Sequence, residues 1–422
     1  MKIAVIGNGL VSQVSATLFA SVGNHTVLFE HESLDDAFLK EPGLEHLYHE
    51  QHSSGRLSYL TKNELAETHY KFILLSETTP KEAFDKFRIE LEPSINHGAY
   101  FIILTPSEIG EAQQFSSYLR AQGYRSVVCC IPLLVREGRA INDFSRPESI
   151  FLGCDDEAAL PDIKQLLYPF NRVRNVIKIV STKEAEFTSF AGNAMLATRL
   201  SFMNEMASLA ERCGVDIEVI RECIGRDPRI GQEYLYPGCG FGGKSLTDNV
   251  EKIAQILRQR NDDAGLLDTV LEINRQQKDL LFRKLWRYFN TQLKGKTIAI
   301  WGATFKPGSS SFEQSPALQL IDSLLAQSAR VNLYDPSGAE NLHRQFNNHK
   351  NLTIANSSKQ ACEGADALAI CTEWKEFWNP DFSQLIAALN HPVIFDGRNL
   401  YDPSIMKKVG ITYFGIGRGE RV

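Results

Sequence analysis

The chain has 422 residues and a formal net charge of -6, from 45 Lys and Arg against 51 Asp and Glu. Its hydrophobic content of 43% and charged content of 23% are ordinary for a globular protein. Without a basic block, the composition argues against a nucleic-acid partner, and no apolar run approaches the roughly 20 residues of a membrane helix. A single core rarely serves a chain of this length, so we expect two or three domains.

The N-terminal segment combines an apolar run with a turn. A secretory signal would need a continuous apolar core after a basic start, but here Lys2 is the only early cation and Gly7-Asn8-Gly9 interrupts the run. A buried strand that turns into a helix explains the segment better.

The eight cysteines are scattered, and no C-x-x-C pair occurs. This spacing predicts neither a zinc site nor a disulfide framework, so we expect no metal. Reduced thiols are typical of the cytoplasm, which is the predicted location.

Short apolar runs separated by helical stretches predict two parallel sheets with helices on both faces. The predicted strands are residues 3–6, 26–29, 72–75, 101–104 and 127–130 in a first series, and 297–301, 331–334, 367–371 and 393–395 in a second. Between the series, Met and Leu side chains from Met195 to Leu209 recur at helical spacing. We read this stripe as core or dimer packing and predict two α/β domains joined by a helical one.

The first predicted strand leads into Gly7-Asn8-Gly9-Leu10-Val11-Ser12, a G-x-G-x-x-G pattern with Ser in the third glycine place. Such a turn lets a pyrophosphate approach the backbone at a helix N-terminus, and Gly7, Gly9, Leu10 and Val11 are therefore candidate cofactor residues. Glu30, after the second strand, suits the ribose hydroxyls and favours NAD over NADP. The alternative is a structural glycine pair in a turn.

Four motifs in the middle of the chain are more specific. They are Phe-Ala-Gly-Asn-Ala-Met-Leu-Ala-Thr-Arg at 190–199, Ser-Phe-Met-Asn-Glu at 201–205, Asp-Pro-Arg-Ile-Gly at 227–231 and Pro-Gly-Cys-Gly-Phe-Gly-Gly at 237–243. Together with shorter matches they resemble the UDP-glucose/GDP-mannose dehydrogenase family over essentially the whole chain. The shorter matches are residues 41–44, 136–138, 305–307, 315–318, 372–374 and 396–399.

The resemblance implies two Rossmann-like domains joined by a helical dimerisation domain. On that basis we expect an NAD-binding domain at 1–181, a helical domain at 182–292 and a nucleotide-sugar domain at 293–422. It also implies a homodimer that binds NAD and a nucleotide sugar, with a UDP-sugar favoured.

The resemblance also assigns site residues. Thr79 and Glu137 would line the NAD site, and Arg229 would reach the neighbouring subunit's site. The residues implied to hold the nucleotide sugar are Tyr234, Leu235, Gly242, Lys306 and Arg398. For Lys306 and Arg398 the alternative is a solvated surface cation.

The family implied by the resemblance performs a four-electron oxidation through a cysteine thioester, for which a thiolate is suited. Asn193 of its catalytic group is present here. At the position of the family's catalytic Cys this chain has Ser245, and at five further positions its residue differs from the family pattern. They are Leu133 for Glu, Ser189 for Lys, Asp248 for Lys, Asn249 for Asp and Glu313 for Arg.

Ser245 has two readings. It is a candidate catalytic residue, but a serine nucleophile needs an adjacent base, and none is evident in the sequence. We favour Ser245-Leu246-Thr247-Asp248 as a capping box that begins a helix. Cys239 or Lys244 in the same loop would be the remaining substitutes for lost groups, although an inert loop cysteine is the simpler reading of Cys239.

Three functions remain. The first, which we carry forward, is an NAD-dependent nucleotide-sugar oxidoreductase with two-electron or redox-neutral chemistry. The second is a non-catalytic protein that binds NAD or a nucleotide sugar as a sensor or partner. The third is an ordinary four-electron dehydrogenase that uses Cys239.

Overall fold

The computed structural model describes residues 1–29, 41–60, 69–133, 135–172, 174–260, 264–346 and 349–418. Glu30 lies outside the described residues, as does the side chain of Lys244. The contacts divide the chain into unit 1, Met1–Ala191, and unit 2, Gly192–Val422. Among the described helices, none is long and apolar enough to span a membrane.

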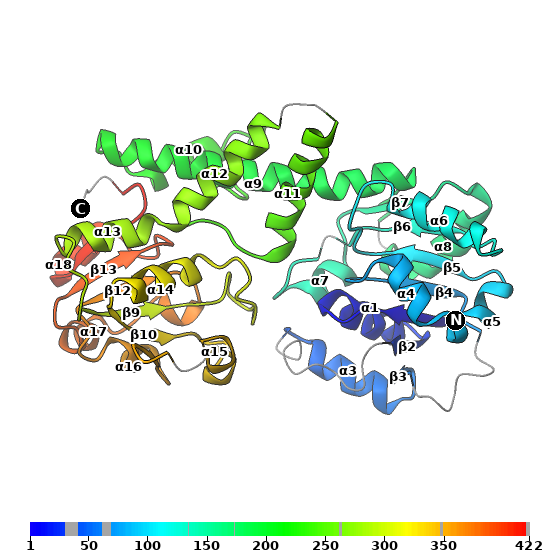
Figure 1. Ribbon diagram of the computed structural model, residues 1–422, viewed down its shortest axis with the longest axis horizontal. Helices are drawn as coiled ribbons and strands as arrows, with labels where there is room; N and C mark the ends of the chain where they lie inside the picture. The colour runs from blue at the N-terminus through cyan, green and yellow to red at the C-terminus, as the bar shows by residue number, and fades with distance from the viewer. Residues whose placement is uncertain are drawn as a thin grey trace. The chain divides into compact units, whose positions relative to one another are not determined.

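Unit 1 is built on an eight-stranded sheet in the order β3-β2-β1-β4-β5-β6-β7-β8 (Figure 1). The strands are β1 Lys2–Ile6, β2 His25–Phe29, β3 Leu57–Tyr59, β4 Phe72–Leu75, β5 Tyr100–Ile103, β6 Val128–Cys130, β7 Ile150–Gly153 and β8 Ile177–Val180. All neighbours pair in parallel except β6 and β7, which meet through the single antiparallel pair Cys130–Gly153. The five predicted strands are confirmed within one residue at their ends, while β3, β7 and β8 were not predicted.

Helices cover both faces of this sheet, as the apolar strands require. They are α1 Leu10–Ser21, α3 Leu44–Ser53, α4 Pro80–Lys86, α5 Arg88–Asn96, α6 Glu111–Ala121, α7 Ala140–Ser145 and α8 Leu160–Leu167, with short 3-10 turns at Glu157–Ala159 and Tyr168–Phe170. One core joins the sheet to α1, α3, α7 and α8, and the other joins it to α4, α5 and α6. The strands β1, β4 and β5 contribute to both cores because they are buried on both faces.

Unit 2 repeats this plan with a six-stranded parallel sheet in the order β11-β10-β9-β12-β13-β14. Its strands are β9 Thr297–Trp301, β10 Arg330–Tyr334, β11 Leu352–Ile354, β12 Ala367–Ile370, β13 Val393–Asp396 and β14 Thr412–Phe414. Its helices are α10 Ile217–Gly225, α11 Lys244–Gln259, α12 Gly265–Lys278, α13 Leu280–Tyr288, α14 Pro316–Ala326, α15 Ala339–Phe346, α16 Ser358–Cys362, α17 Phe382–Ala388 and α18 Pro403–Val409, with a 3-10 turn at Lys375–Phe377. The four predicted strands of this series are confirmed, and β11 and β14 are additional. Two parallel-strand sheets, separated along the sequence by a helical region, confirm the predicted fold class.

The long helix α9, Thr182–Cys213, carries the predicted apolar stripe. Only part of the stripe is core: Met203 is fully buried, whereas Met195 is 61% and Leu209 46% exposed. The first predicted domain boundary falls where α9 begins, and the division between the two units falls inside the helix. The three-domain boundaries therefore stay predictions.

Three aromatic rings anchor α1 in unit 1. Phe19 meets Phe144 edge-on at 5.6 Å between ring centroids and Phe170 at 5.4 Å, and the latter two lie 5.1 Å apart. Phe19 is 1% exposed. Because α1 follows the glycine turn, these rings also fix the position of that turn.

Removing the central ring is expected to weaken unit 1 selectively. Phe19→Ala should lower its free energy of unfolding by about 3–5 kcal/mol, since a buried aromatic is replaced by a cavity. All four tryptophans lie in unit 2. In a urea titration, the midpoint measured by far-UV circular dichroism should therefore fall further than the midpoint measured by tryptophan fluorescence. Ile89→Ala, at a position 84% exposed, is the control and should change stability by less than about 0.5 kcal/mol.

Candidate functional site

The glycine turn of unit 1 is a place of very close backbone approach. Gly7 follows β1 with φ +153°, and a Cβ on it would lie 2.1 Å from the carbonyl oxygen of Ser76. Gly9 is the N-cap residue of α1, and a Cβ there would lie 2.3 Å from Oε1 of Glu77. A side chain at Gly7 would force the Ser76 backbone away, so this position requires glycine. At Gly9, where φ is -125°, the close neighbour is only the end of the Glu77 side chain.

The other predicted cofactor residues of the described chain lie at the same edge of the sheet or in the loop after β6. Leu10 and Val11 form the first turn of α1. Thr79 follows β4 as the N-cap of α4, where its hydroxyl accepts a hydrogen bond from the Glu82 amide at 3.3 Å. Glu137 is half-buried in the loop before α7. Since β1 and β4 are neighbours whose connections leave in opposite directions along the sheet, the crevice after them is where such sheets bind ligands.

Glu77 is a residue of this crevice that the sequence analysis did not identify. Its carboxylate lies at the N-terminus of α1 and accepts hydrogen bonds from the Val11 amide at 2.9 Å and the Ser12 amide at 3.3 Å. Its backbone has φ +58° and donates to the Thr105 hydroxyl at 2.6 Å. The signal was available: an acidic residue two positions after a predicted strand belongs to the carboxyl edge of the sheet.

In unit 2 the glycine loop at 237–243 is held by amide side chains. Asn204 on α9 accepts from the Gly238 amide at 2.9 Å, and Gln277 on α12 donates to the Gly238 carbonyl at 2.6 Å. Asn274 accepts from the Phe241 amide at 2.8 Å and donates to its carbonyl at 3.1 Å. The loop backbone is therefore fixed by two helices.

Arg398 is placed beside this loop by the segment after β13. Its Nε donates to the Cys371 carbonyl at 2.7 Å and lies 3.1 Å from a carboxylate oxygen of Glu373. Its side chain is only 16% exposed, so the alternative of a solvated surface cation is wrong for Arg398. Lys306 is half-buried in the segment after β9.

The remaining predicted substrate residues are spread more widely. Gly242 is packed so closely that a Cβ would meet the Gln314 carbonyl oxygen at 2.6 Å. Leu235 is 2% exposed in the core of unit 2, and Tyr234 beside it is half-buried with φ +58°. Arg229 has a side chain that is 86% exposed and pairs with Asp227 at 2.6 Å.

The predicted capping box at Ser245 is wrong. Helix α11 begins one residue earlier, at Lys244, and its N-cap residue is Gly243 with φ +88° and no capping side chain. The reason is that the Gly243 amide donates to the Glu313 carbonyl at 2.9 Å and its Cα faces the Phe305 ring, which fixes the turn. Ser245 consequently lies in the first turn, exposed, and its side chain forms no hydrogen bond within the described chain. Asn193, the other candidate catalytic residue, is half-buried on α9.

Cys239 is buried under the backbone of the loop after β13. It is 1% exposed, its thiol lies 3.7 Å from the Cys371 carbonyl, and a Cβ on Gly397 would meet it at 2.8 Å. The Cys371 thiol, which donates to it, and the Arg398 guanidinium lower the pKa of Cys239 to about 7. These neighbours favour ionisation of the thiol, but its burial keeps it out of reach of a substrate.

Lys278, at the end of α12, is a further residue that the sequence analysis missed. Its ammonium group donates to the Gln314 side chain at 3.2 Å, and its stem lies against Gly240. Burial lowers the pKa of this lysine. Asn274, Gln277 and Lys278 recur at three- and four-residue spacing, so their common helix face was detectable from the sequence.

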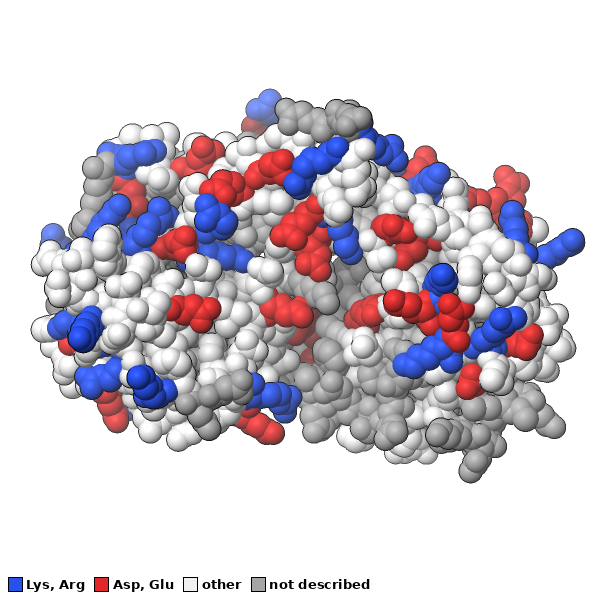
Figure 2. Space-filling view, in the orientation of Figure 1, with Lys and Arg blue, Asp and Glu red and all other residues white. Residues whose placement is uncertain are grey.

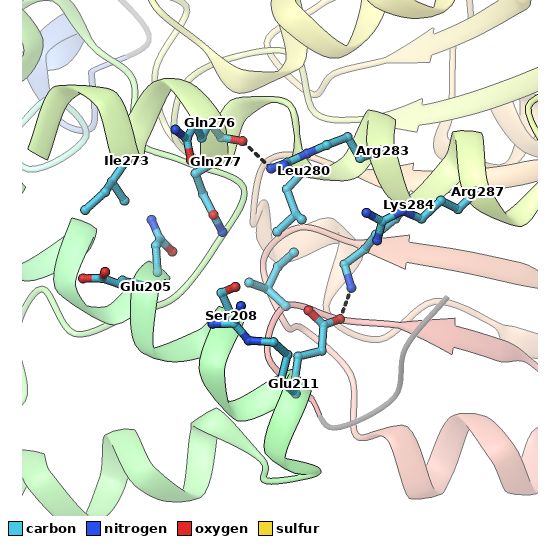
Figure 3. A pocket seen from close by; sticks show the side chains of 13 residues that line it. Glu205, Ser208, Glu211, Ile273, Gln276, Gln277, Leu280, Arg283, Lys284 and Arg287 are labelled. Atoms are coloured by element: carbon cyan, nitrogen blue, oxygen red, sulfur yellow. Dashed lines mark hydrogen bonds and ion pairs between the residues drawn. The ribbon is translucent and has the colours of Figure 1, made fainter. Parts of the chain in front are cut away.

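A cavity of about 540 Å³ lies among α9, α12 and α13 of unit 2 (Figure 3). Its lining includes Asn204 and Gln277, the two side chains that hold Gly238. Lys284 and Glu211 form an ion pair across it.

Charges of both signs are interspersed over the face of the molecule shown in Figure 2, so that face presents no extended basic patch.

These features define a class: a protein with a dinucleotide-type glycine turn in one parallel sheet and a second parallel sheet whose carboxyl edge carries Lys306, Arg398 and a fixed glycine loop. Residues 1–171 match the NAD binding domain of the UDP-glucose/GDP-mannose dehydrogenase family, residues 183–276 its central domain and residues 299–403 its UDP binding domain.

Whole-chain relatives agree. The UDP-glucose 6-dehydrogenase of Pseudomonas aeruginosa is 34% identical, covering 99% of this chain and 98% of its own. That of Rhizobium meliloti is 30% identical over the full length of both. In fold, the chain is similar to a UDP-glucose dehydrogenase from Pyrobaculum islandicum, with a TM-score of 0.85 at 24% identity over 99% of this chain and 97% of the other. It is also similar to a UDP-D-ManNAc dehydrogenase from Pyrococcus horikoshii, with a TM-score of 0.82 at 24% identity over 99% and 100%. The chain belongs to the UDP-glucose/GDP-mannose dehydrogenase family.

Membership makes NAD the cofactor, as predicted, and the described residues of the turn fit it. Without a Cβ at Gly7 and Gly9, a neighbouring group can approach the backbone itself, as Ser76 and Glu77 do here. The amides of Val11 and Ser12 already hold an anionic group, the carboxylate of Glu77, and a phosphate oxygen presents the same acceptor chemistry.

The burial of the cysteines predicts their reactivity. Cys213 and Cys223 are exposed and the other six are buried, so two thiols should react quickly with DTNB in the native protein and eight after denaturation. Cys213→Ser together with Cys223→Ser should remove the fast phase. A fast thiol that survives in this double variant and disappears on further Cys239→Ala substitution would contradict the enclosed position of Cys239.

Proposed function

We propose that this protein is an NAD-dependent oxidoreductase of a nucleotide sugar, most simply a UDP-sugar, whose chemistry is two-electron or redox-neutral instead of four-electron. The family supplies the cofactor and the substrate class. The observation that carries the altered chemistry is the position of Ser245, which is exposed in the first turn of α11 without a hydrogen-bonded base within the described chain.

A covalent route needs a nucleophile that forms an ester-like intermediate and a group that activates water against it. Leu133 packs against an apolar core of unit 1, where a carboxylate would be needed by the family pattern. Cys239 is 1% exposed. Neither side chain therefore offers a replacement for the thioester step.

Hydride transfer alone does not need that intermediate. Bound NAD would supply the hydride acceptor, with one NAD reduced for each two-electron oxidation of a carbinol to a carbonyl. The hydroxyl proton would pass to a base or to water. A redox-neutral conversion would return the hydride to the substrate and leave no net NADH.

The binding roles rest on the residues around the two sheets. Gly7, Gly9, Leu10 and Val11 would hold the dinucleotide phosphates. Arg398 would hold the nucleotide sugar, because its guanidinium is fixed beside the glycine loop by the Cys371 carbonyl and keeps donors besides Nε. The homodimer, the role of Arg229 in it and the cytoplasmic location remain predictions.

The stoichiometry of NADH tests the proposal directly. The protein would be titrated by calorimetry with NAD and with UDP-, GDP- and dTDP-sugars, and NADH would then be counted for any pair that binds. We expect no more than one NADH per sugar consumed, with product analysis to detect redox-neutral conversion. Two NADH per sugar would contradict the proposal, and binding without any product would point to a non-catalytic binding protein.

Substitution of Ser245 separates a bystander from a nucleophile. Because Ser245 has no hydrogen-bonded base among the described residues, Ser245→Ala should leave the turnover rate within about twofold of the parent. A loss of a hundredfold or more, with Asp248→Ala unchanged as the neighbouring control, would make Ser245 the nucleophile and return a covalent mechanism.

Substitution of Arg398 tests the sugar-nucleotide site. Arg398→Ala should weaken nucleotide-sugar binding on the order of a hundredfold, since a charge-assisted contact to phosphate is lost, and Arg398→Lys should recover only part of it. Arg344→Ala is the matched control, because Arg344 is an exposed cation of the same unit. Equal affinities of Arg398→Ala and Arg344→Ala would remove Arg398 from the site.

A further inference from the structure

Unit 1 places a carboxylate where the dinucleotide needs an anion site. Glu77 accepts hydrogen bonds from the amides of Val11 and Ser12, which lie in the first turn of α1 and have no acceptor within the helix. Its Oε1 lies so close to Gly9 that a Cβ there would approach it to 2.3 Å. These contacts use the same donors and the same close approach that a pyrophosphate uses in a dinucleotide turn.

The position of this carboxylate is imposed by the backbone. Glu77 has a left-handed φ of +58°, which is uncommon for a residue with a side chain, and its amide is fixed on the Thr105 hydroxyl at 2.6 Å. The side chain thus leaves the end of β4 toward the neighbouring turn after β1. The residue as a whole is nevertheless exposed, although burial of its carboxyl group against the turn raises the pKa of that group.

Two other carboxylates of unit 1 hold helix N-termini in the same way. Glu186 accepts from the amides of Gly110 and Ala112 at the start of α6, and it is fully buried. Glu41 accepts from Gly138 and Ala140 at the start of α7 and is 4% exposed. Both are enclosed parts of the fold. Glu77 differs because it is exposed and its helix begins at the dinucleotide turn.

We propose that Glu77 is an internal competitor of the NAD pyrophosphate, a gate that must leave the N-terminus of α1 before the cofactor binds. The docked carboxylate stabilises the empty turn by satisfying its donors. Only molecules with the carboxylate undocked bind NAD, so the apparent NAD affinity is the intrinsic affinity multiplied by the undocked fraction. If the docked fraction is about nine in ten, the apparent affinity falls roughly tenfold.

Calorimetric titration with NAD tests this inference without turnover. Glu77→Ala should bind NAD on the order of tenfold more tightly than the parent, and Glu77→Gln should bind more tightly by a smaller factor because the amide oxygen still accepts. Inorganic pyrophosphate, titrated alone, should show the same order, since the competition concerns the phosphates and not the nucleosides. In the absence of NAD, Glu77→Ala should melt at a lower temperature because the amides of α1 lose their acceptor.

Glu186→Gln is the matched control, since it also removes a carboxylate from a helix N-terminus of unit 1. It should lower the melting temperature and leave the NAD affinity unchanged. Weaker or equal NAD binding by Glu77→Ala would overturn the inference, because it would make Glu77 a cofactor ligand or a purely structural cap. If Glu77→Ala does not fold, the direction of the change in Glu77→Gln decides. The inference rests on the NAD-binding domain and not on the altered chemistry, so its failure would leave the NADH stoichiometry unaffected.

Discussion

Both units depend on a backbone that passes too close to its neighbour to allow a Cβ. In unit 1, Gly7 after β1 lies against Ser76 after β4, and in unit 2, Gly302 after β9 lies against Thr372 after β12. A Cβ on Gly302 would be 2.4 Å from that of Thr372. In each sheet these are the first strand in sequence and the neighbour at which the strand order reverses. The loops that leave such a point diverge, and ligands of open α/β sheets bind in the crevice between them.

The residue that follows each close contact is acidic, and its partner differs. Glu77 follows Ser76 and accepts from the amides at the start of α1. Glu373 follows Thr372 and pairs with the guanidinium of Arg398. A carboxylate on backbone amides competes with a phosphate for donors, whereas a carboxylate on an arginine orients a donor that has others to offer. One local arrangement therefore gives the first crevice a competitor and the second a positioned cation.

The sequence predicted most of this framework because its signals are local. Apolar strands and the glycine turn at Gly7 and Gly9 can be read from neighbouring residues, and nine strands were found in that way. Strands β3, β11 and β14 have three residues each, and β8 has two adjacent exposed residues between two partly buried ones, so their patterns are too short or too polar to be distinctive. The start of α11 was misplaced because the Glu313 carbonyl and the Phe305 ring, about 60 to 70 positions along the chain, fix Gly243, and no nearby residue indicates this.

The site residues divide along the same line. Arg398 was predicted from its motif, but its low exposure follows from Cys371 and Glu373 on another strand connection. Glu77 was missed because its hydrogen-bond partners, the amides at the start of α1, belong to a different loop. The sequence of the glycine turn alone does not show that these amides have an acceptor. Long-range contacts thus decide whether a recognisable site is accessible, and in this protein they act on binding and on chemistry separately. The proposed movement of the Glu77 carboxylate would set the NAD affinity, through the fraction of molecules in which the turn amides are occupied. The enclosed thiol of Cys239 and the exposed hydroxyl of Ser245 instead determine which covalent intermediates can form. Cofactor binding can consequently be strengthened or weakened at Glu77 without any change in the groups available for the reaction.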